Sequence, residues 1–179
     1  MAVLIEAISV VIRADSLAEK FPGGWDAFKQ IVPNSTLCSD NEIFRVGFMV
    51  PKDVEVFVNL LQSMGLVFFR NGEAIDIAVV DQVHGPTSKC EWLEFGRVIL
   101  GDSGGEIAIC RLVGTHSTGI KVFFPVGWEY KKSLSSNFSF VPSKDVQKEL
   151  KFLKHEDGKD VFLNSLTGKE VYVGRTYKK

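Results

Sequence analysis

The sequence predicts an α+β fold: a mostly antiparallel sheet, built as a meander of hairpins, with two or three helices packed on it. Two strand-then-helix units open the chain, and five segments with a hydrophobic period of two follow between residues 66 and 126. The turns between these segments are short and rich in Gly and Asp, as in hairpins. Strands gathered in one part of a chain favour antiparallel pairing over a doubly wound parallel sheet.

The first opening unit is an apolar strand followed by two short helices. Residues 3–13 carry apolar side chains on both faces, which predicts a central strand covered on both sides. Asp15 is a suitable N-cap for the first helix, and residues 22–24, Pro-Gly-Gly, end it. The second helix presents Trp25 and Phe28 on one face.

The second unit begins with an alternating strand over residues 42–50. Pro51 then stands where the first turn of a helix tolerates proline, because the N–H at that position has no helical partner. Gly65 is a suitable helix end. Between them, apolar side chains recur at helical spacing at Val54, Phe57, Val58, Leu61 and Met64.

The central part of the chain supplies the predicted meander. Its strands are expected at Leu66–Arg70, Ile75–Val83, Trp92–Leu100, Ile107–Val113 and Ile120–Val126. If the second, third and fourth of these are sequential neighbours, loops 84–91 and 114–119 lie at one end of the sheet. The loop 101–105 then lies at the other end, since antiparallel hairpins alternate ends.

We predict a single domain over residues 1–179, with a core over 1–130 and an extension over 144–179. In the extension, Ser143 can cap a helix whose apolar stripe is Val146, Leu150 and Leu153. Val161–Leu163 and Val171–Val173 then flank Thr167-Gly168 as a closing hairpin.

Composition is that of a globular protein, with 45% hydrophobic and 24% charged residues. An odd number of cysteines, three, without C-x-x-C spacing argues against a disulfide framework and for a reducing compartment. The apolar N-terminus lacks the basic region of a signal peptide, and no stretch reaches the ~20 apolar residues of a membrane span. We therefore expect a cytoplasmic protein without membrane contact.

Charge is balanced overall, with a net of −1, which argues against a general nucleic-acid binder. It is unevenly distributed, because residues 129–179 carry eleven Lys and Arg against seven Asp and Glu. The basic part could contact a polyanion through Lys144 to Lys179. We favour the alternative that it docks against the acidic remainder or forms a solvated surface.

The stretch Gly101-Asp102-Ser103-Gly104-Gly105 resembles the nucleophile loop of trypsin-like serine proteases. The resemblance implies an attacking Ser103 and an oxyanion held by adjacent N–H groups. That family orders its catalytic residues His, Asp, Ser, well separated along the chain. Here only His84 precedes Ser103, and the one Asp between them is Asp102 itself. We therefore interpret the stretch as a hairpin turn whose glycines supply positive φ angles.

The sequence gives little support for a catalytic cysteine, a zinc site or a phosphate-binding loop. Cys110 alternates with Ala108 and Leu112, which is typical of a buried thiol, whereas the reactivity of Cys38 and Cys90 stays open. The Cys and His residues lack the spacing of zinc sites, and the Gly-rich stretch lacks the residues of a phosphate loop. The sequence predicts no metal and no cofactor.

Polar loops at strand ends carry the candidate ligand site. The segment 84–92 combines imidazole, hydroxyl, ammonium and indole groups, and a similar loop follows the fourth strand of the meander. The selected ligand-binding residues are His84, Lys89, Trp92 and His116. The alternative is an ordinary loop in which Trp92 anchors the core.

These observations favour a non-catalytic domain that binds a partner protein or a small ligand. A first alternative is a hydrolase in which Ser103 or a cysteine is the nucleophile and His84 or His116 is the base. A second alternative is a polyanion contact through the basic C-terminal part.

Overall fold

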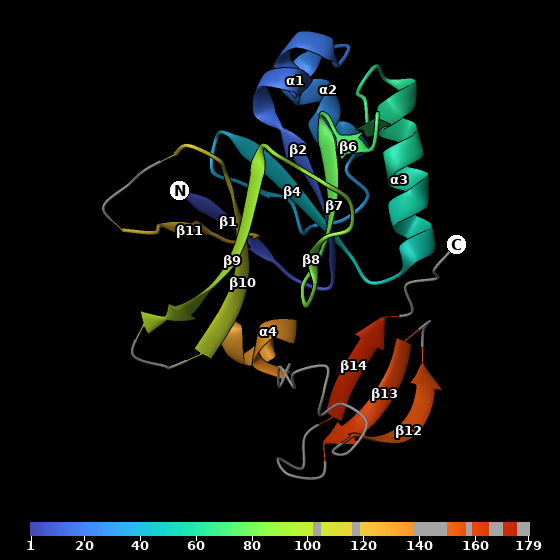
Figure 1. The fold of residues 1–179 in the computed structure, drawn as a ribbon, viewed down its shortest axis with the longest axis vertical. Coiled ribbons are helices and arrows are strands. Elements are labelled where there is room, and N and C mark those ends of the chain that lie inside the picture. The colour runs from blue at the N-terminus through green and yellow to red at the C-terminus, as the bar shows by residue number, and fades with distance from the viewer. Residues whose placement is uncertain (102–104, 116–118, 138–149, 157–158, 165–169, 175–179) are drawn as a thin grey trace.

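The computed structural model describes residues 1–101, 105–115, 119–137, 150–156, 159–164 and 170–174 (Figure 1). The protein has the predicted α+β fold, with helices packed on largely antiparallel sheets. Sheet I has the order β11-β1-β10-β9 and contains β1 (Ala2–Ile5), β9 (Leu93–Leu100), β10 (Gly105–Leu112) and β11 (Val122–Phe123). Its β1–β11 pair is parallel and its other pairs are antiparallel.

Sheet II is wholly antiparallel and has the order β3-β4-β2-β7-β8. Its strands are β2 (Ile8–Arg13), β3 (Cys38–Ser39), β4 (Ile43–Phe48), β7 (Ile77–Asp81) and β8 (Gly85–Pro86). A small separate hairpin joins β5 (Phe69–Arg70) to β6 (Glu73–Ala74).

The helices are α1 (Ala14–Lys20), α2 (Gly24–Ile31), α3 (Pro51–Ser63) and the short α4 (Leu134–Asn137). The predicted helix after residue 50 is confirmed: Pro51 occupies its first turn, and Val54, Phe57, Val58 and Leu61 are buried. The longest described helix has 13 residues, and no helix in the described ranges is long and apolar enough to cross a bilayer.

A sharp corner replaces the single strand that the sequence predicts over residues 3–13. The chain turns at Glu6-Ala7, where Ala7 has a φ of 48°, so β1 belongs to sheet I and β2 to sheet II. The side chain of Gln82 accepts a hydrogen bond from the Ala7 N–H (2.8 Å), and its backbone N–H donates to the Ala7 carbonyl (2.9 Å). Both halves are central strands, as expected. Alanine rarely adopts a positive φ, so an alanine inside an apolar run is expected to continue the strand, and the sequence did not indicate the bend.

Packing follows from the side-chain alternation of β2. Val10 and Ile12 face α1, α2 and α3, which cover the outer face of sheet II (Figure 1). Val11 points the other way, into a second core that sheet II shares with sheet I. A third cluster covers the far face of sheet I and includes Trp128 and Tyr130. The two sheets therefore pack face to face, with the helices on one outer side.

The predicted meander is divided between the two sheets. The β9–β10 hairpin forms as expected, with Leu93 opposite Leu112 and Leu100 opposite Gly105. However, β7 pairs with β2 in sheet II, so the segments Ile75–Val83 and Trp92–Leu100 are not sequential neighbours. The expected strands at 66–70 and 120–126 shorten to two residues each.

The C-terminal extension departs from the predicted helix. Leu150–Glu156 form a strand, β12, which pairs with β13 (Lys159–Asn164), so the helix is wrong at Leu150 and Leu153. The helical spacing of its apolar residues was ambiguous, and pairing with a neighbouring strand decided the outcome. Val146 lies outside the described residues. The predicted closing hairpin is confirmed as β13–β14, where β14 is Glu170–Gly174.

Candidate functional site

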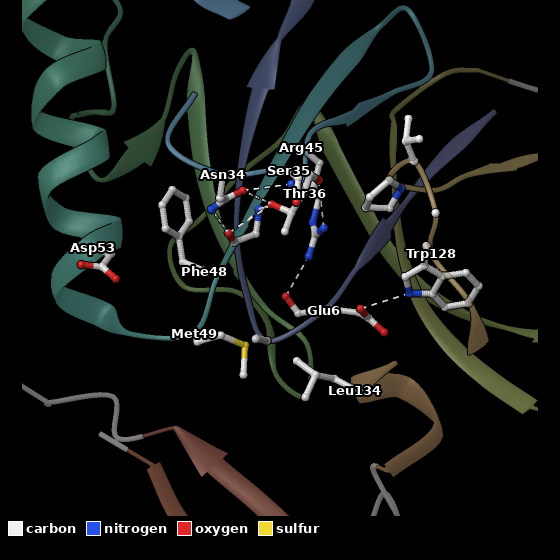
Figure 2. A pocket seen from close by; sticks show the side chains of 15 residues that line it. Glu6, Asn34, Ser35, Thr36, Arg45, Phe48, Met49, Asp53, Trp128 and Leu134 are labelled. Carbon is white, nitrogen blue, oxygen red and sulfur yellow. Dashed lines mark hydrogen bonds between the residues drawn. The ribbon is translucent and has the colours of Figure 1, made fainter. Parts of the chain in front are cut away.

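An open cleft of about 460 Å³ lies beside the corner between β1 and β2 (Figure 2). Four parts of the chain line it: the corner itself, the loop 34–36 with β4, the start of α3, and segments from 125 to 134. Figure 2 shows Asp53 on the α3 side and Trp128 on the opposite side, with Glu6 and Arg45 between them. Residues far apart in sequence thus meet around one hollow.

Arg45 supplies the buried positive charge of this cleft. In the ladder it stands opposite Val11, so its side chain enters the space between the two sheets, and only 2% of the residue is exposed. Its Nε donates to Ser9 Oγ (2.9 Å), its Nη2 to the Glu6 carbonyl (3.0 Å) and its Nη1 to the Thr36 carbonyl (3.3 Å). All three acceptors are neutral. A guanidinium has five N–H donors, and a fourth hydrogen bond, to the Cys38 side chain, leaves at least one of them for another partner.

Gly47 makes room for this guanidinium. A Cβ at position 47 would lie 2.5 Å from Arg45 Nη2 and 2.8 Å from its Cζ. The Gly47 N–H donates to Thr36 Oγ1 (2.6 Å), and its carbonyl accepts from Asn34 Nδ2 (2.8 Å). The loop 34–36 is therefore fixed to β4 at the point where Arg45 reaches the cleft.

The charge on Arg45 is not matched by a directly bonded carboxylate. Within the described ranges no Asp or Glu oxygen forms an ion pair with it at 4.0 Å or less. Burial lowers the pKa of Arg45, and the Glu6 charge and a hydrogen bond to the Cys38 side chain act in the opposite direction. Because an arginine in water titrates far above neutrality, the side chain stays protonated here.

Glu6 is the acidic counterpart on the floor of the cleft. Its Oε1 accepts from the Ser135 backbone N–H (3.0 Å) and from Ser135 Oγ (2.7 Å). Its Oε2 accepts from the indole Nε1 of Trp128 (3.2 Å; Figure 2). These bonds hold the segment 128–135 against the corner and fix the carboxylate away from Arg45.

Apolar side chains form the rest of the wall. Trp128 is stacked on Phe124 at a centroid distance of 4.4 Å, which fixes its ring at the rim. Met49 and Leu134 also line the cleft, and Val126 at its edge is 99% exposed. A ligand could therefore bind a charged end at the buried groups and an apolar end against these side chains.

The residues selected from the sequence lie elsewhere. His84 is a surface side chain, 80% exposed, with Nδ1 3.0 Å from Asp81 Oδ1. Lys89 and Trp92 both bind the β6 region: Lys89 pairs with Glu73, and Trp92 Nε1 donates to the Ala74 carbonyl (3.1 Å).

The hydrogen bond from Lys89 to Glu73, with a second to Glu91, raises the pKa of this lysine. None of His84, Lys89 and Trp92 lines the cleft. His116 lies outside the described residues, and a ligand role for the four remains a prediction.

Of the candidate nucleophiles, the three thiols are shielded from solvent to different degrees, and the serine is not among the described residues. Burial raises the pKa of Cys38 to about 11 and also raises the pKa values of Cys90 and Cys110. Thiols of this kind are protonated at neutral pH and react slowly. Ser103 lies outside the described residues.

The sequence interpretation missed Glu6 and Arg45. One signal was present: on the face of β4 opposite Phe44 and Val46, Arg45 interrupts an otherwise apolar or small pattern. A charged residue on a two-sided buried strand needs buried partners. The corner at Ala7, which brings those partners to it, had no sequence signal.

The cleft thus combines a buried cation, a fixed carboxylate and an apolar wall, an arrangement suited to binding a small polar-headed molecule. None of the groups described there forms a nucleophile–base pair. Comparison of the chain with protein-family models, with curated proteins and with solved structures found no match.

Proposed function

We propose that this protein binds a small molecule carrying a carboxylate and holds that carboxylate against Arg45 in the cleft. One observation carries the proposal: Arg45 is 2% exposed, lines the cleft, and hydrogen-bonds only uncharged groups, namely the Ser9 hydroxyl, two backbone carbonyls and the Cys38 thiol. Burying an unpaired charge lowers the stability of the folded protein by on the order of several kcal/mol per ion, even after the surroundings relax. A ligand anion would supply the missing counter-charge.

The geometry of a guanidinium favours a carboxylate. Its planar fork can donate two parallel N–H bonds to the two oxygens of such a group. At least one N–H group of Arg45 is left after its bonds to Ser9, Glu6, Thr36 and Cys38. The volume of about 460 Å³ is in the range of small-molecule sites, about 300–1,000 Å³.

A reducing, cytoplasmic location belongs to the same proposal. Cys38, Cys90 and Cys110 belong to one cluster between the sheets, and all three are free thiols. Such thiols persist where glutathione and thioredoxin keep cysteines reduced.

Calorimetric titration with matched ligands tests the function without altering the protein. Hexanoate and hexanamide have the same length and shape, but only hexanoate carries a charge. We expect hexanoate to bind at about millimolar Kd, equivalent to about −4 kcal/mol, and hexanamide to bind at least tenfold more weakly. Equal affinities, or no binding of either, would contradict the proposal.

Two arginine variants assign the binding to the cleft. Arg45→Lys keeps the charge but loses the fork, so hexanoate affinity should fall several-fold. Arg111→Lys is the matched control, because Arg111 is paired with Glu94 on the surface of sheet I and is not a cleft residue. Loss of affinity in Arg111→Lys and not in Arg45→Lys would place the ligand elsewhere.

A further inference from the structure

Two opposite charges line one cleft without pairing with each other. The guanidinium of Arg45 is bonded to a hydroxyl and two carbonyls, and the carboxylate of Glu6 is bonded to Ser135 and Trp128. Unrestrained, such groups would form an ion pair. Here neutral partners keep them apart while leaving both in the lining of the cleft.

The two charges are nonetheless close. Arg45 Nη2 lies 3.0 Å from the backbone carbonyl oxygen of Glu6 itself. The Glu6 carboxylate is only three C–C bonds from its Cα, each about 1.5 Å long. Its charge acts on Arg45: burial lowers the pKa of that guanidinium, and the Glu6 charge raises it. The separation therefore suits a ligand whose own charges are a few bonds apart.

Both groups keep unused hydrogen-bonding capacity. A carboxylate offers about four acceptor sites, and Glu6 accepts three hydrogen bonds, from Ser135 N–H, Ser135 Oγ and Trp128 Nε1. Arg45 retains at least one N–H donor after its bonds to Ser9, Glu6, Thr36 and Cys38. An acceptor site beside a donor on a guanidinium is complementary to a molecule that carries an ammonium beside a carboxylate.

A ligand with a single charge meets opposition in this cleft. The Glu6 carboxylate repels a ligand carboxylate bound at Arg45, and Arg45 repels a ligand ammonium bound at Glu6. A zwitterion satisfies both charges at once. Its apolar side chain would then contact Trp128, Met49 and Leu134, which line the same cleft.

We infer that the ligand is a small zwitterion of the amino-acid class, with its carboxylate on Arg45, its ammonium on Glu6 and an apolar side chain. This inference rests on the proposed function and narrows it. Asp53, an exposed carboxylate in the first turn of α3, lines the cleft on the far side of Met49 (Figure 2) and is the competing partner for an ammonium.

Calorimetry with three ligands of matched chain length tests the inference on the unaltered protein. Norleucine carries both charges, hexanoate only the carboxylate and pentylamine only the ammonium. We expect norleucine to bind at least tenfold more tightly than either. Equal binding of hexanoate and norleucine would overturn the zwitterion and leave the proposed function intact. If neither hexanoate nor norleucine binds, or if pentylamine binds most tightly, the proposed function is contradicted as well.

Two isosteric variants then identify the ammonium partner. Glu6→Gln should weaken norleucine about tenfold and leave hexanoate unchanged or tighter, because the repelling charge is gone. Asp53→Asn, the matched control in the same cleft, should leave norleucine binding within twofold. The opposite pattern would overturn the assignment to Glu6. If Glu6→Gln does not fold, the three-ligand comparison on the wild-type chain still decides the ligand class.

Discussion

Replacing Gly47 by alanine should destabilise the protein strongly, because the space that a Cβ would fill is occupied by the guanidinium of Arg45. The added carbon would lie 2.5 Å from Nη2, 2.8 Å from Cζ and 3.0 Å from Nη1. Arg45 is held at that point by hydrogen bonds to the carbonyls of Glu6 and Thr36 and to Ser9 Oγ. The guanidinium must move, and any such movement breaks hydrogen bonds that hold it there.

The size of the effect follows from the bonds that are lost. A hydrogen bond to a charged group contributes about 1.5–3 kcal/mol. Loss of the two Nη bonds, offset by the roughly 0.5–1 kcal/mol gained on removing a strand glycine, gives a net loss of about 2–5.5 kcal/mol. With a urea m value of about 2 kcal/mol/M, the unfolding midpoint should fall by about 1–2.8 M.

Urea unfolding followed by circular dichroism measures this change. Gly96→Ala is the matched control: it places the same Cβ in β9, where nothing lies within 4 Å, and should change the free energy of unfolding by less than about 1 kcal/mol. A Gly47→Ala protein as stable as Gly96→Ala would refute the claim that Arg45 is fixed in this position.

Three further predictions, two substitutions and one chemical modification, follow from contacts elsewhere in the structure. Gly105→Ala would drive a Cβ into the ring of Tyr130 and should cost about 1–3 kcal/mol of unfolding free energy, measured in urea; a neutral effect would contradict the packing of Tyr130 on β10. Burial acts to raise the pKa of Asp76, but its bonds to Lys20 and the Val67 N–H outweigh burial and hold that pKa below the ordinary value. The stability this gives should be present above about pH 4 and lost as pH falls toward the folded pKa, so Asp76→Asn should flatten the acid limb of a stability–pH curve; an unchanged limb would contradict it. Iodoacetamide at pH 8, read by mass spectrometry, should modify the half-buried Cys90 before the buried Cys38 and Cys110, whose burial raises both pKa values; equal rates would contradict that burial.

The sequence predicted the parts of the fold whose signals are local. Pro51 and the apolar stripe that follows it are sufficient for α3, since the starting residue and the period agree. The β9–β10 hairpin likewise follows from alternation on both sides of a Gly-rich turn. A helix or hairpin could therefore be predicted from the sequence wherever residues close together in the chain determine it.

The arrangement of the strands was not accessible, because it depends on contacts between distant segments. The left-handed Ala7 divides one apolar run between two sheets, and its stabilising partner, Gln82, is 75 residues away. In the extension, the spacing of Leu150 and Leu153 fitted a helix, but pairing with β13 makes the segment a strand.

The candidate site depends on the same distant contacts. Arg45 becomes a site residue only because the corner presents the Glu6 carbonyl to it and the segment around Ser135 closes on the Glu6 carboxylate. Polar loops such as 84–92 attract attention in a sequence because their side chains are chemically diverse. Here Lys89 pairs with Glu91 and Trp92 donates to the Ala74 carbonyl, and a ligand role for these residues remains a prediction.

The most direct measurement is a two-dimensional ¹H–¹⁵N NMR titration of the protein with norleucine. Binding at Arg45 and Glu6 should shift the amide signals of Ala7, Thr36 and Gly47 and the indole signal of Trp128 together, along one saturable curve. The indole signal of Trp92 should stay in place. Shifts centred on Trp92 and Lys89, or no saturable shift at the four cleft signals, would contradict the assignment of the binding site to this cleft.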